Sequence, residues 1–255
     1  MPYPRASDAQ VEAFRRDGYL AVRGAVLPAD LERLQALCDR LLEQKERIAF
    51  DWAWEAGDDR AQRKFRIVQT SPSLLSKSEL AGERFRVWAT EFASALLGSP
   101  VEFWYDQFLA KPPEEGARTP WHQDEAYWGR NLDERGITCW MPFHDVGVEN
   151  GCMHFVPGAH LEGVRVHRPV ENVQSDLLVC DVDSARVVPV PIGLGDVTFH
   201  HGKMPHMTTP NVSKRWRRAL SQHFRVVGSQ GEGDHYPWKI YVNQFTGERI
   251  KPPSR

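Results

Sequence analysis

The sequence predicts a mainly β chain with N-terminal helices, and two patterns along the sequence support this prediction. Up to residue 100, apolar residues recur at the spacing of helices that bury one face. From Val101 onward, short runs of β-branched and aromatic residues alternate with glycine, proline and asparagine turns. We therefore expect one domain over 1–255: helical support and a cap over 1–100, a β-barrel core over 101–228 and a C-terminal extension over 229–255.

Three helices are expected before the barrel. Ser7 begins a capping box, and Gly18 provides the C-terminal stop of the first helix. Pro28 opens the second, on which four apolar residues share one face: Leu31, Leu34, Cys38 and Leu41. The third is expected over Glu79–Leu97, where Gly98 follows. The polar stretch over 51–64, with Trp52 and Trp54 inside it, is expected to be a loop or cap.

Strands are expected at short intervals along the rest of the chain. Their ranges are Tyr19–Val22, Val101–Ala110, Ile137–Phe143, Cys152–Val156, Arg186–Pro191, Val197–His200 and Ala219–Val227. Asn150-Gly151 predicts a hairpin turn, and Pro157-Gly158 and Gly195-Asp196 predict tight turns. Such regular spacing is typical of an all-β barrel or sandwich.

Composition argues against several classes of partner. The formal net charge is −2, because 34 acidic residues offset 32 basic ones, so neither nucleic acid nor an anionic membrane is expected as a partner. No apolar run approaches the roughly 20 residues of a membrane span. The N-terminus lacks the apolar core of a secretion signal, and the four cysteines lack C-x-x-C spacing. We expect reduced thiols, a cytoplasmic location, and a monomer or homodimer that acts on a small molecule.

A His-x-acid triplet is the first candidate for metal chemistry. Two imidazoles and one carboxylate bind iron(II) on one face of an octahedron and leave positions open for a chelating 2-oxo acid and O2. On a strand, residues two apart point the same way, so His-x-Asp supplies two ligands compactly. The chain has two such triplets, at His122-Gln123-Asp124 and at His160-Leu161-Glu162. The second follows a tight turn, whereas the first lies in an aromatic segment suited to a pocket wall.

The third ligand is expected from the run Phe199–His206, where His200, His201 and His206 compete. The far carboxylate of a chelated 2-oxo acid is best bound by a bidentate arginine. Arg217 lies eleven residues beyond His206 on the next expected strand, whereas Asn211 and Val212 occupy that offset from the other two histidines. The spacing favours His206, with His200 or His201 as the alternatives.

Several sequence blocks, taken in order, resemble the phytanoyl-CoA dioxygenase family of 2-oxoglutarate oxygenases. The resemblance runs over most of the chain, from Phe14 to Phe224. Its blocks are Tyr105-Asp106-Gln107 with Lys111-Pro112-Pro113, Trp121-His122-Gln123-Asp124, Glu149-Asn150-Gly151-Cys152, Val156-Pro157-Gly158-Ala159-His160, Gly195-Asp196-Val197-Thr198-Phe199-His200, and Met204-Pro205-His206 through Asn211 to Arg217-Arg218-Ala219. Single blocks are common, but their ordered succession is specific.

The resemblance implies a double-stranded β-helix, the jelly-roll or cupin-like barrel, that uses Fe(II), 2-oxoglutarate and O2. It implies iron ligands at His122, Asp124 and His206. It also implies 2-oxoglutarate binding by Arg217, Thr208, Trp140 and Gln107. The carboxylate that related halogenases lack is present as Asp124, so hydroxylation of a small organic metabolite, with release of succinate and CO2, is expected. No phosphate-binding glycine loop accompanies a basic cluster, so a CoA substrate is not expected.

Two other functions use the same residues. A cupin-like isomerase or hydrolase would bind metal through the same triad of His122, Asp124 and His206. It would have no need of Arg217. A catalytically silent binding barrel would need neither the triad nor the arginine. The joint presence of both features favours the oxygenase.

Overall fold

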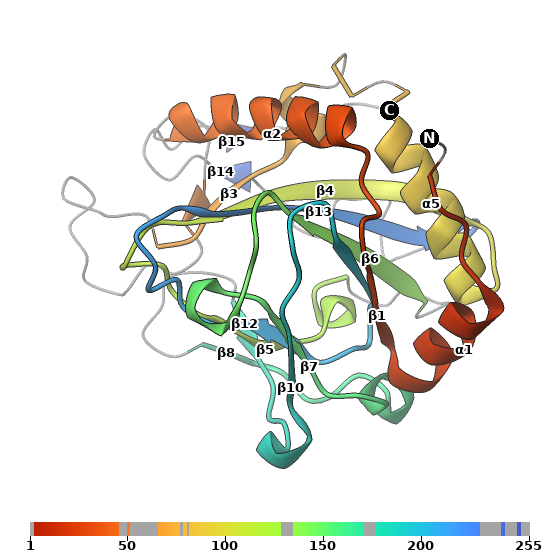
Figure 1. Ribbon diagram of the computed structural model, residues 1–255. Coiled ribbons are helices and arrows are strands. Elements are labelled where there is room, and N and C mark those ends of the chain that lie inside the picture. The colour runs from red at the N-terminus through yellow and green to blue at the C-terminus, as the bar shows by residue number, and fades with distance from the viewer. Residues whose placement is uncertain are drawn as a thin grey trace.

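Two antiparallel sheets form the core of the molecule (Figure 1). The computed structural model describes residues 3–45, 50–51, 66–76, 79–80, 82–128, 135–170, 177–229, 241–242 and 249–250. Apart from Asp51, the expected loop or cap over 51–64 lies outside these residues, as does most of the expected C-terminal extension. Among the described residues, no helix combines the length and the apolar character needed to cross a membrane.

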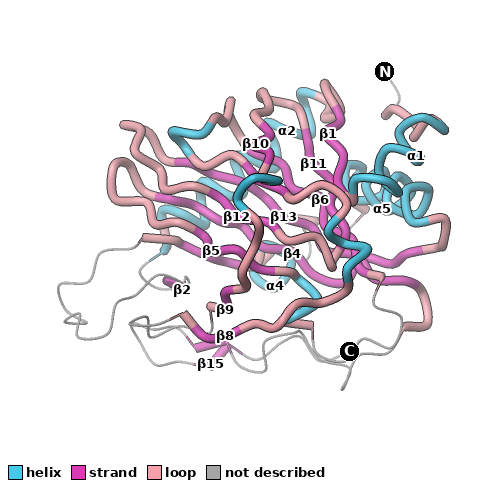
Figure 2. Tube along the Cα trace, turned by 90° about the horizontal axis from the view of Figure 1, so that it is seen from below, coloured by secondary structure: helices cyan, strands magenta, loops and turns pink. Residues whose placement is uncertain are grey.

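The larger sheet has seven strands in the order β1-β11-β6-β13-β4-β3-β2. Their bounds are β1 Tyr19–Val22, β2 Phe50–Asp51, β3 Val68–Thr70, β4 Val101–Lys111, β6 Gly136–Pro142, β11 Val197–His201 and β13 Arg217–Val226. Figure 2 shows β1, β11, β6, β13 and β4 running side by side. The sheet joins the N-terminal strand β1 to strands from the second half of the chain.

The smaller sheet has four strands in the order β10-β7-β12-β5. Their bounds are β5 Thr119–His122, β7 Met153–Phe155, β10 Val188–Val190 and β12 His206–Thr208. Two separate ribbons pair β8 (Arg168–Pro169) with β9 (Leu178–Val179), and β14 (Tyr241–Val242) with β15 (Arg249–Ile250). Side chains of both main sheets line one cavity, so the two sheets face each other across it.

Helices cover the other face of the larger sheet (Figure 1). They are α1 (Asp8–Asp17), α2 (Pro28–Glu43), the single turn α4 (Pro72–Leu75) and α5 (Arg84–Leu97). The predicted capping box at Ser7 and the left-handed stop at Gly18 are both present. Helix α5 begins five residues later than predicted, because Gly82 has a φ of +68° and Glu83 caps the helix.

Strands of the larger sheet alternate between the two faces, and both faces are buried. On β6, Ile137, Cys139 and Met141 belong to the cluster packed against the helices. Thr138 and Trp140 point the other way, into the cavity between the sheets. Residues at alternate positions of a central strand therefore become available for chemistry.

Two local predictions were wrong. Asn150-Gly151 does not connect a hairpin, because the flanking strands β6 and β7 belong to different sheets. Instead, a 3-10 turn over Val148–Asn150 ends at Gly151, which has a φ of +88°. The run Arg186–Pro191 is not one strand either: a 3-10 turn over Ser184–Arg186 precedes the shorter β10.

Candidate metal centre and its cavity

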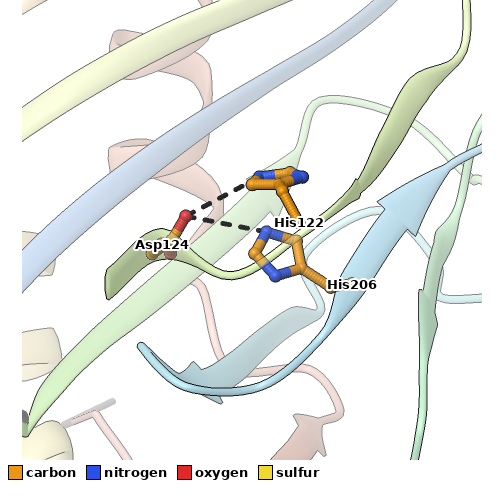
Figure 3. A group of neighbouring side chains, drawn as sticks. All are labelled: His122, Asp124 and His206. Atoms are coloured by element: carbon orange, nitrogen blue, oxygen red, sulfur yellow. Dashed lines mark ion pairs between the residues drawn. The ribbon is translucent and has the colours of Figure 1, made fainter. Parts of the chain in front are cut away.

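Three side chains converge where β12 meets β5. His206 and His122 are directly paired across these strands, and their ring centroids are 4.1 Å apart. Asp124 Oδ1 lies 3.8 Å from His122 Nε2 and 3.7 Å from His206 Nε2 (Figure 3). One ligand atom from each residue lies within 4.8 Å of the other two, a spacing that can hold a metal ion.

The triplet reaches this arrangement in a way that the strand argument did not foresee. Strand β5 ends at His122, and Asp124 is the first residue of a 3-10 turn over Asp124–Ala126. The turn, rather than strand alternation, brings the carboxylate alongside the imidazole. The turn is held to the larger sheet, because the Glu125 amide donates to the Gly202 carbonyl at 3.0 Å.

Backbone carbonyls orient both imidazoles. Nδ1 of His122 lies 2.8 Å from the Pro120 carbonyl oxygen, and Nδ1 of His206 lies 2.9 Å from the Met204 carbonyl oxygen. A carbonyl only accepts, so each Nδ1 carries the hydrogen and each Nε2 keeps its lone pair. Both lone pairs are thereby presented to the ligand site, as in metal-binding histidines held by an outer partner.

Electrostatics keeps all three groups in their ligating forms. Burial lowers the pKa of His122, and burial lowers the pKa of His206 well below its usual range, where His122 adds to the effect. Burial alone would raise the pKa of the Asp124 carboxyl, but His206 and His200 hold it well below its ordinary value. At neutral pH the site therefore offers two neutral imidazoles and one carboxylate.

The two competing histidines are not members of the candidate ligand group. His200 Nε2 is 3.2 Å from Oδ2 of Asp124, the carboxylate oxygen other than the one near His122 and His206. Nδ1 of His201 accepts a hydrogen bond from the Lys203 amide at 3.0 Å, and its ring lies near His160. Of the three candidates in this run, only His206 completes a ligand group among the described residues.

Arg217 is buried inside the cavity next to this group. Its side chain is 2% exposed, its guanidinium carbon lies 5.8 Å from the centre of the Trp140 ring, and its Nε has no hydrogen-bond partner among the described residues. Burial lowers the pKa of Arg217 to about 10. Arg218 points to the opposite face, where it pairs with Asp39 of α2. Strand alternation thus places the expected arginine inside.

The other residues expected to bind 2-oxoglutarate line the same cavity. They are Thr208, Trp140 and Gln107. Thr208 Oγ1 accepts from Lys111 Nζ at 2.7 Å and donates to Thr119 Oγ1 at 3.0 Å. Gln107 Oε1 lies 3.0 Å from His223 Nε2. All seven predicted site residues therefore lie around one space.

The sequence analysis missed Lys111, Thr138 and His223, which also belong to this site. Lys111 is fully buried, and burial lowers its pKa well below its usual range, with Arg217 adding to the effect. Extending the alternation of the strand from Gln107 would have placed residue 111 on the inner face. Thr138 and His223 have no recognisable pattern in the sequence around them, because their roles arise from pairing between distant strands.

A second cavity opens from His122 and Asp124 toward Tyr127 and Trp128. Five residues line both cavities: Gln107, Leu109, Thr119, His122 and Asp124. The remaining described lining of the second cavity is Ile67, Gln69, Tyr105 and Leu177. Asp124 is the only acidic or basic residue among these described lining residues, histidine aside. The triad therefore lies between a cationic cavity and a largely uncharged one.

The residues fit the expected cofactors. Two imidazoles and a carboxylate are the donor set that suits iron(II) with open positions. A buried arginine with an unpartnered Nε, beside a buried lysine, suits a small dicarboxylate.

Comparison with known proteins gives one family and several relatives. The family model described as phytanoyl-CoA dioxygenase (PhyH) matches residues 14–219. Phytanoyl-CoA dioxygenase domain-containing protein 1 from Bos taurus is 30% identical over 122 residues, 46% of this chain and 42% of that protein, so the match spans less than half of that relative. Methylphosphonate hydroxylase from Gimesia maris is 24% identical over a match that covers 96% of this chain and 92% of that protein.

A solved structure extends the similarity to the fold. EvdO2 from Micromonospora carbonacea var. aurantiaca, complexed with 2-oxoglutarate, is 28% identical with a TM-score of 0.73. The match covers 92% of this chain and 96% of that one. Together with the two facing antiparallel sheets, this similarity confirms the predicted double-stranded β-helix.

Proposed function

The chain belongs to the phytanoyl-CoA dioxygenase family of Fe(II)/2-oxoglutarate-dependent oxygenases, and from this premise we propose that it hydroxylates a small organic molecule. In this proposal His122, Asp124 and His206 bind iron(II), and Arg217, Thr208, Trp140 and Gln107 bind 2-oxoglutarate. One observation carries the proposal. Three ligand atoms within 4.8 Å of one another share a cavity with a buried arginine that has no acidic partner among the described residues.

When bound, iron(II) with 2-oxoglutarate and O2 supplies the oxidation, which releases succinate and CO2 as the substrate is oxidised. The protein's own residues arrange the reactants. The carbonyls of Pro120 and Met204 hold the imidazoles, and Arg217 neutralises the distal carboxylate of the co-substrate. Trp140 walls the co-substrate cavity and limits the entry of water, which strengthens the ion pair.

Hydroxylation is the oxidation that best fits the site. The carboxylate ligand is present as Asp124, which leaves no vacant ligand position for a halide. A relative that matches nearly the whole chain is named a hydroxylase. The second cavity supports a small and largely uncharged substrate, because its described lining offers no cation for the phosphates of a CoA thioester.

A cupin-like isomerase or hydrolase is less well supported. Such an enzyme would bind metal through the same three residues, but it would have no use for a buried cation pair beside them. Arg217 and Lys111 lie opposite each other on β13 and β4, inside the barrel, where unneutralised charge is costly. A dicarboxylate co-substrate accounts for that pair.

Succinate formation tests the proposal. Purified protein with iron(II), ascorbate and 2-oxoglutarate under air is expected to release succinate slowly without any added substrate. His122→Ala and Arg217→Ala are expected to abolish this release, whereas Arg218→Ala, on the outer face, is expected to retain it. Release of succinate that persists in Arg217→Ala would contradict the assigned co-substrate site.

Binding provides a second readout that needs no turnover. Under anaerobic conditions, wild-type protein with iron(II) and 2-oxoglutarate is expected to show a visible charge-transfer absorption that Arg217→Ala lacks. Protein that binds iron(II) but shows neither this absorption nor succinate would favour the isomerase or hydrolase over the oxygenase.

A further inference from the structure

The two carboxylate oxygens of Asp124 have different surroundings. Oδ1 faces both imidazoles, at 3.8 Å from His122 Nε2 and 3.7 Å from His206 Nε2 (Figure 3). Oδ2 faces the larger sheet, where it accepts a hydrogen bond from Thr138 Oγ1 at 2.6 Å and lies 3.2 Å from His200 Nε2. The carboxylate is thus held with one oxygen toward the ligand site and one toward the sheet.

Thr138 holds this position because it lies in the middle of the larger sheet. It is 1% exposed on β6, and the strand register pairs it with His200 of β11 on one side and His223 of β13 on the other. Paired residues point to the same face, so the three side chains form a row under Asp124. Strand pairing on both sides therefore restrains the threonine backbone.

The hydroxyl of Thr138 is also fully engaged. Its Oγ1 lies 2.9 Å from His223 Nδ1 as well as 2.6 Å from Asp124 Oδ2. A carboxylate oxygen carries no hydrogen, so the hydroxyl donates its one hydrogen to Asp124. With its hydrogen committed to the carboxylate, Thr138 has no other orientation that satisfies both partners.

His223 is itself immobilised. Its ring stacks on Tyr105, with centroids 4.2 Å apart and planes at 15°. Trp128 Nε1 donates to the Tyr105 hydroxyl at 2.6 Å, and all three of these side chains are buried. The support for Asp124 therefore extends through packed rings to the wall of the second cavity.

The orientation of this carboxylate matters for the number of free positions at an octahedral metal. If one atom from each of the three protein residues bound the metal, they would take three positions; a chelating 2-oxo acid would take two more, and one position would remain for O2. If both oxygens of the aspartate coordinated, that last position would be filled. A group that keeps the second oxygen occupied therefore keeps the site reactive.

We propose that Thr138 is a positioning residue that restricts Asp124 to a single coordinating oxygen, Oδ1, by holding Oδ2 in a hydrogen bond. The inference rests on the proposed metal ligands and adds a residue that does not touch the metal itself. Without the hydroxyl, His200 Nε2 at 3.2 Å would be the hydrogen-bond partner left to Oδ2 among the described residues, so the carboxylate would be held less firmly. The loss of orientation would weaken metal binding, and coordination by the second oxygen would interfere with 2-oxoglutarate.

The test uses Co(II) as the probe, because its visible absorption reports the number and arrangement of ligands. Thr138→Val keeps the shape and β-branching of the side chain and removes the donor. It is expected to raise the Kd for Co(II) by about 10- to 100-fold, the usual effect of removing an outer-shell partner. It is also expected to change the Co(II) absorption spectrum and to raise the Kd of the Co(II)-loaded protein for 2-oxoglutarate. Thr138→Ser restores the hydroxyl and is expected to restore all three properties.

Thr198→Val is the matched control. Thr198 lies on the same inner face, two residues before His200 on β11. It is fully buried, and its Oγ1 has no hydrogen-bond partner in the described ranges of the chain. Its substitution is expected to leave the Kd for Co(II) and the spectrum unchanged. If Thr138→Val does not fold, Thr138→Ala removes the same hydroxyl with less bulk and is expected to give the same spectral change.

The outcomes separate this inference from the function on which it rests. A Thr138→Val protein with the wild-type spectrum and Kd for Co(II) would overturn the positioning role while leaving the metal centre intact. Wild-type protein that binds no Co(II), or that binds it equally well after His122→Ala, would overturn the metal centre and this inference with it.

Discussion

Lys111 lies directly opposite Arg217 in the register of β4 and β13, so two fully buried cations lie side by side on the inner face of the larger sheet. Within the part of the chain that the structure describes, Lys111 Nζ donates only to oxygens without charge: Thr208 Oγ1 at 2.7 Å and the carbonyls of Thr208 and Thr209. Buried charges normally have a counter-ion, and a bound dicarboxylate would provide one. This relationship leads to the first two predictions.

Replacement of Lys111 by Met is expected to weaken 2-oxoglutarate binding without loss of stability. The substitution removes a positive charge from the cavity and frees Thr208, so we expect the Kd for 2-oxoglutarate to rise about tenfold, or about 1.4 kcal/mol. A lysine whose folded pKa is lowered costs stability at every pH below its unfolded pKa. The free energy of unfolding at pH 7 is therefore expected to stay the same or rise.

Calorimetric titration of the metal-loaded protein measures the Kd, and urea unfolding without ligand measures stability. Lys214→Met, at an exposed position, is the control for the loss of one lysine. Wild-type affinity for 2-oxoglutarate in Lys111→Met would show that the lysine has no part in the co-substrate site.

Replacement of Arg217 by Lys tests whether the co-substrate needs a bidentate partner. Lysine keeps the charge but presents a point charge in place of the planar fork, so the Kd for 2-oxoglutarate is expected to rise about 10- to 100-fold. Arg218→Lys, one residue along and directed to Asp39 on the outer face, is expected to change this Kd by less than about twofold. Equal effects of the two substitutions would contradict the assignment of Arg217.

Spacing along the chain was enough to predict which residues gather around the cavity. The offset between His206 and Arg217 favoured, among three histidines, the one that joins the candidate ligand group, and strand alternation placed Arg217 inside and Arg218 outside. The three long helices were predicted as well, because capping residues and apolar faces are local features. These predictions succeeded because they depended on contacts within one element or on simple periodicity.

Predictions that depended on pairing between distant strands failed or were never made. Asn150-Gly151 has the composition of a hairpin turn, but the chain passes there from one sheet to the other. The contact of Thr138 with Asp124 arises because β6 lies between β11 and β13, which begin about 60 and 80 residues further along the chain. No periodicity in a single segment reveals such an arrangement.

Gly18 is expected to tolerate alanine much less well than Gly24. Both have positive φ, +77° and +57°, so alanine at either costs about 1 kcal/mol in backbone strain. A Cβ at Gly18 would lie 2.2 Å from His160 Nδ1 and 2.4 Å from Met204 Cε, whereas a Cβ at Gly24 meets nothing within 4 Å. We expect Gly24→Ala to lose about 1 kcal/mol of unfolding free energy, and Gly18→Ala about 2–4 kcal/mol.

Gly18→Ala is also expected to weaken metal binding, because the Met204 carbonyl orients His206. Urea unfolding of the two variants measures stability, and Co(II) titration measures the metal site. Equal losses of stability in both variants would mean that the steric contact with Met204 and His160 relaxes at no cost.

His201 is expected to make stability depend on pH between 6.5 and 5. Burial lowers the pKa of His201 to about 3, and the Lys203 amide donates to its Nδ1, which holds the ring neutral. In the unfolded chain the ring takes up a proton below a pKa of about 6.5. The unfolded state therefore binds more protons in this window, and the free energy of unfolding falls as the pH falls. We expect His201 alone to lower the free energy of unfolding by about 1–2 kcal/mol between pH 6.5 and pH 5.

His201→Asn isolates that contribution, because the amide oxygen of asparagine can accept from the Lys203 amide in place of Nδ1 but does not titrate. Urea unfolding of metal-free protein at pH 6.5 and at pH 5 gives the change in stability for each form. The variant is expected to lose about 1–2 kcal/mol less than the wild type over this interval. Other buried histidines, among them His223, whose pKa is lowered by burial to about 4, contribute equally to both proteins and cancel in the difference. Identical pH dependence in the two proteins would show that His201 takes up its proton as readily in the folded state as in the unfolded chain.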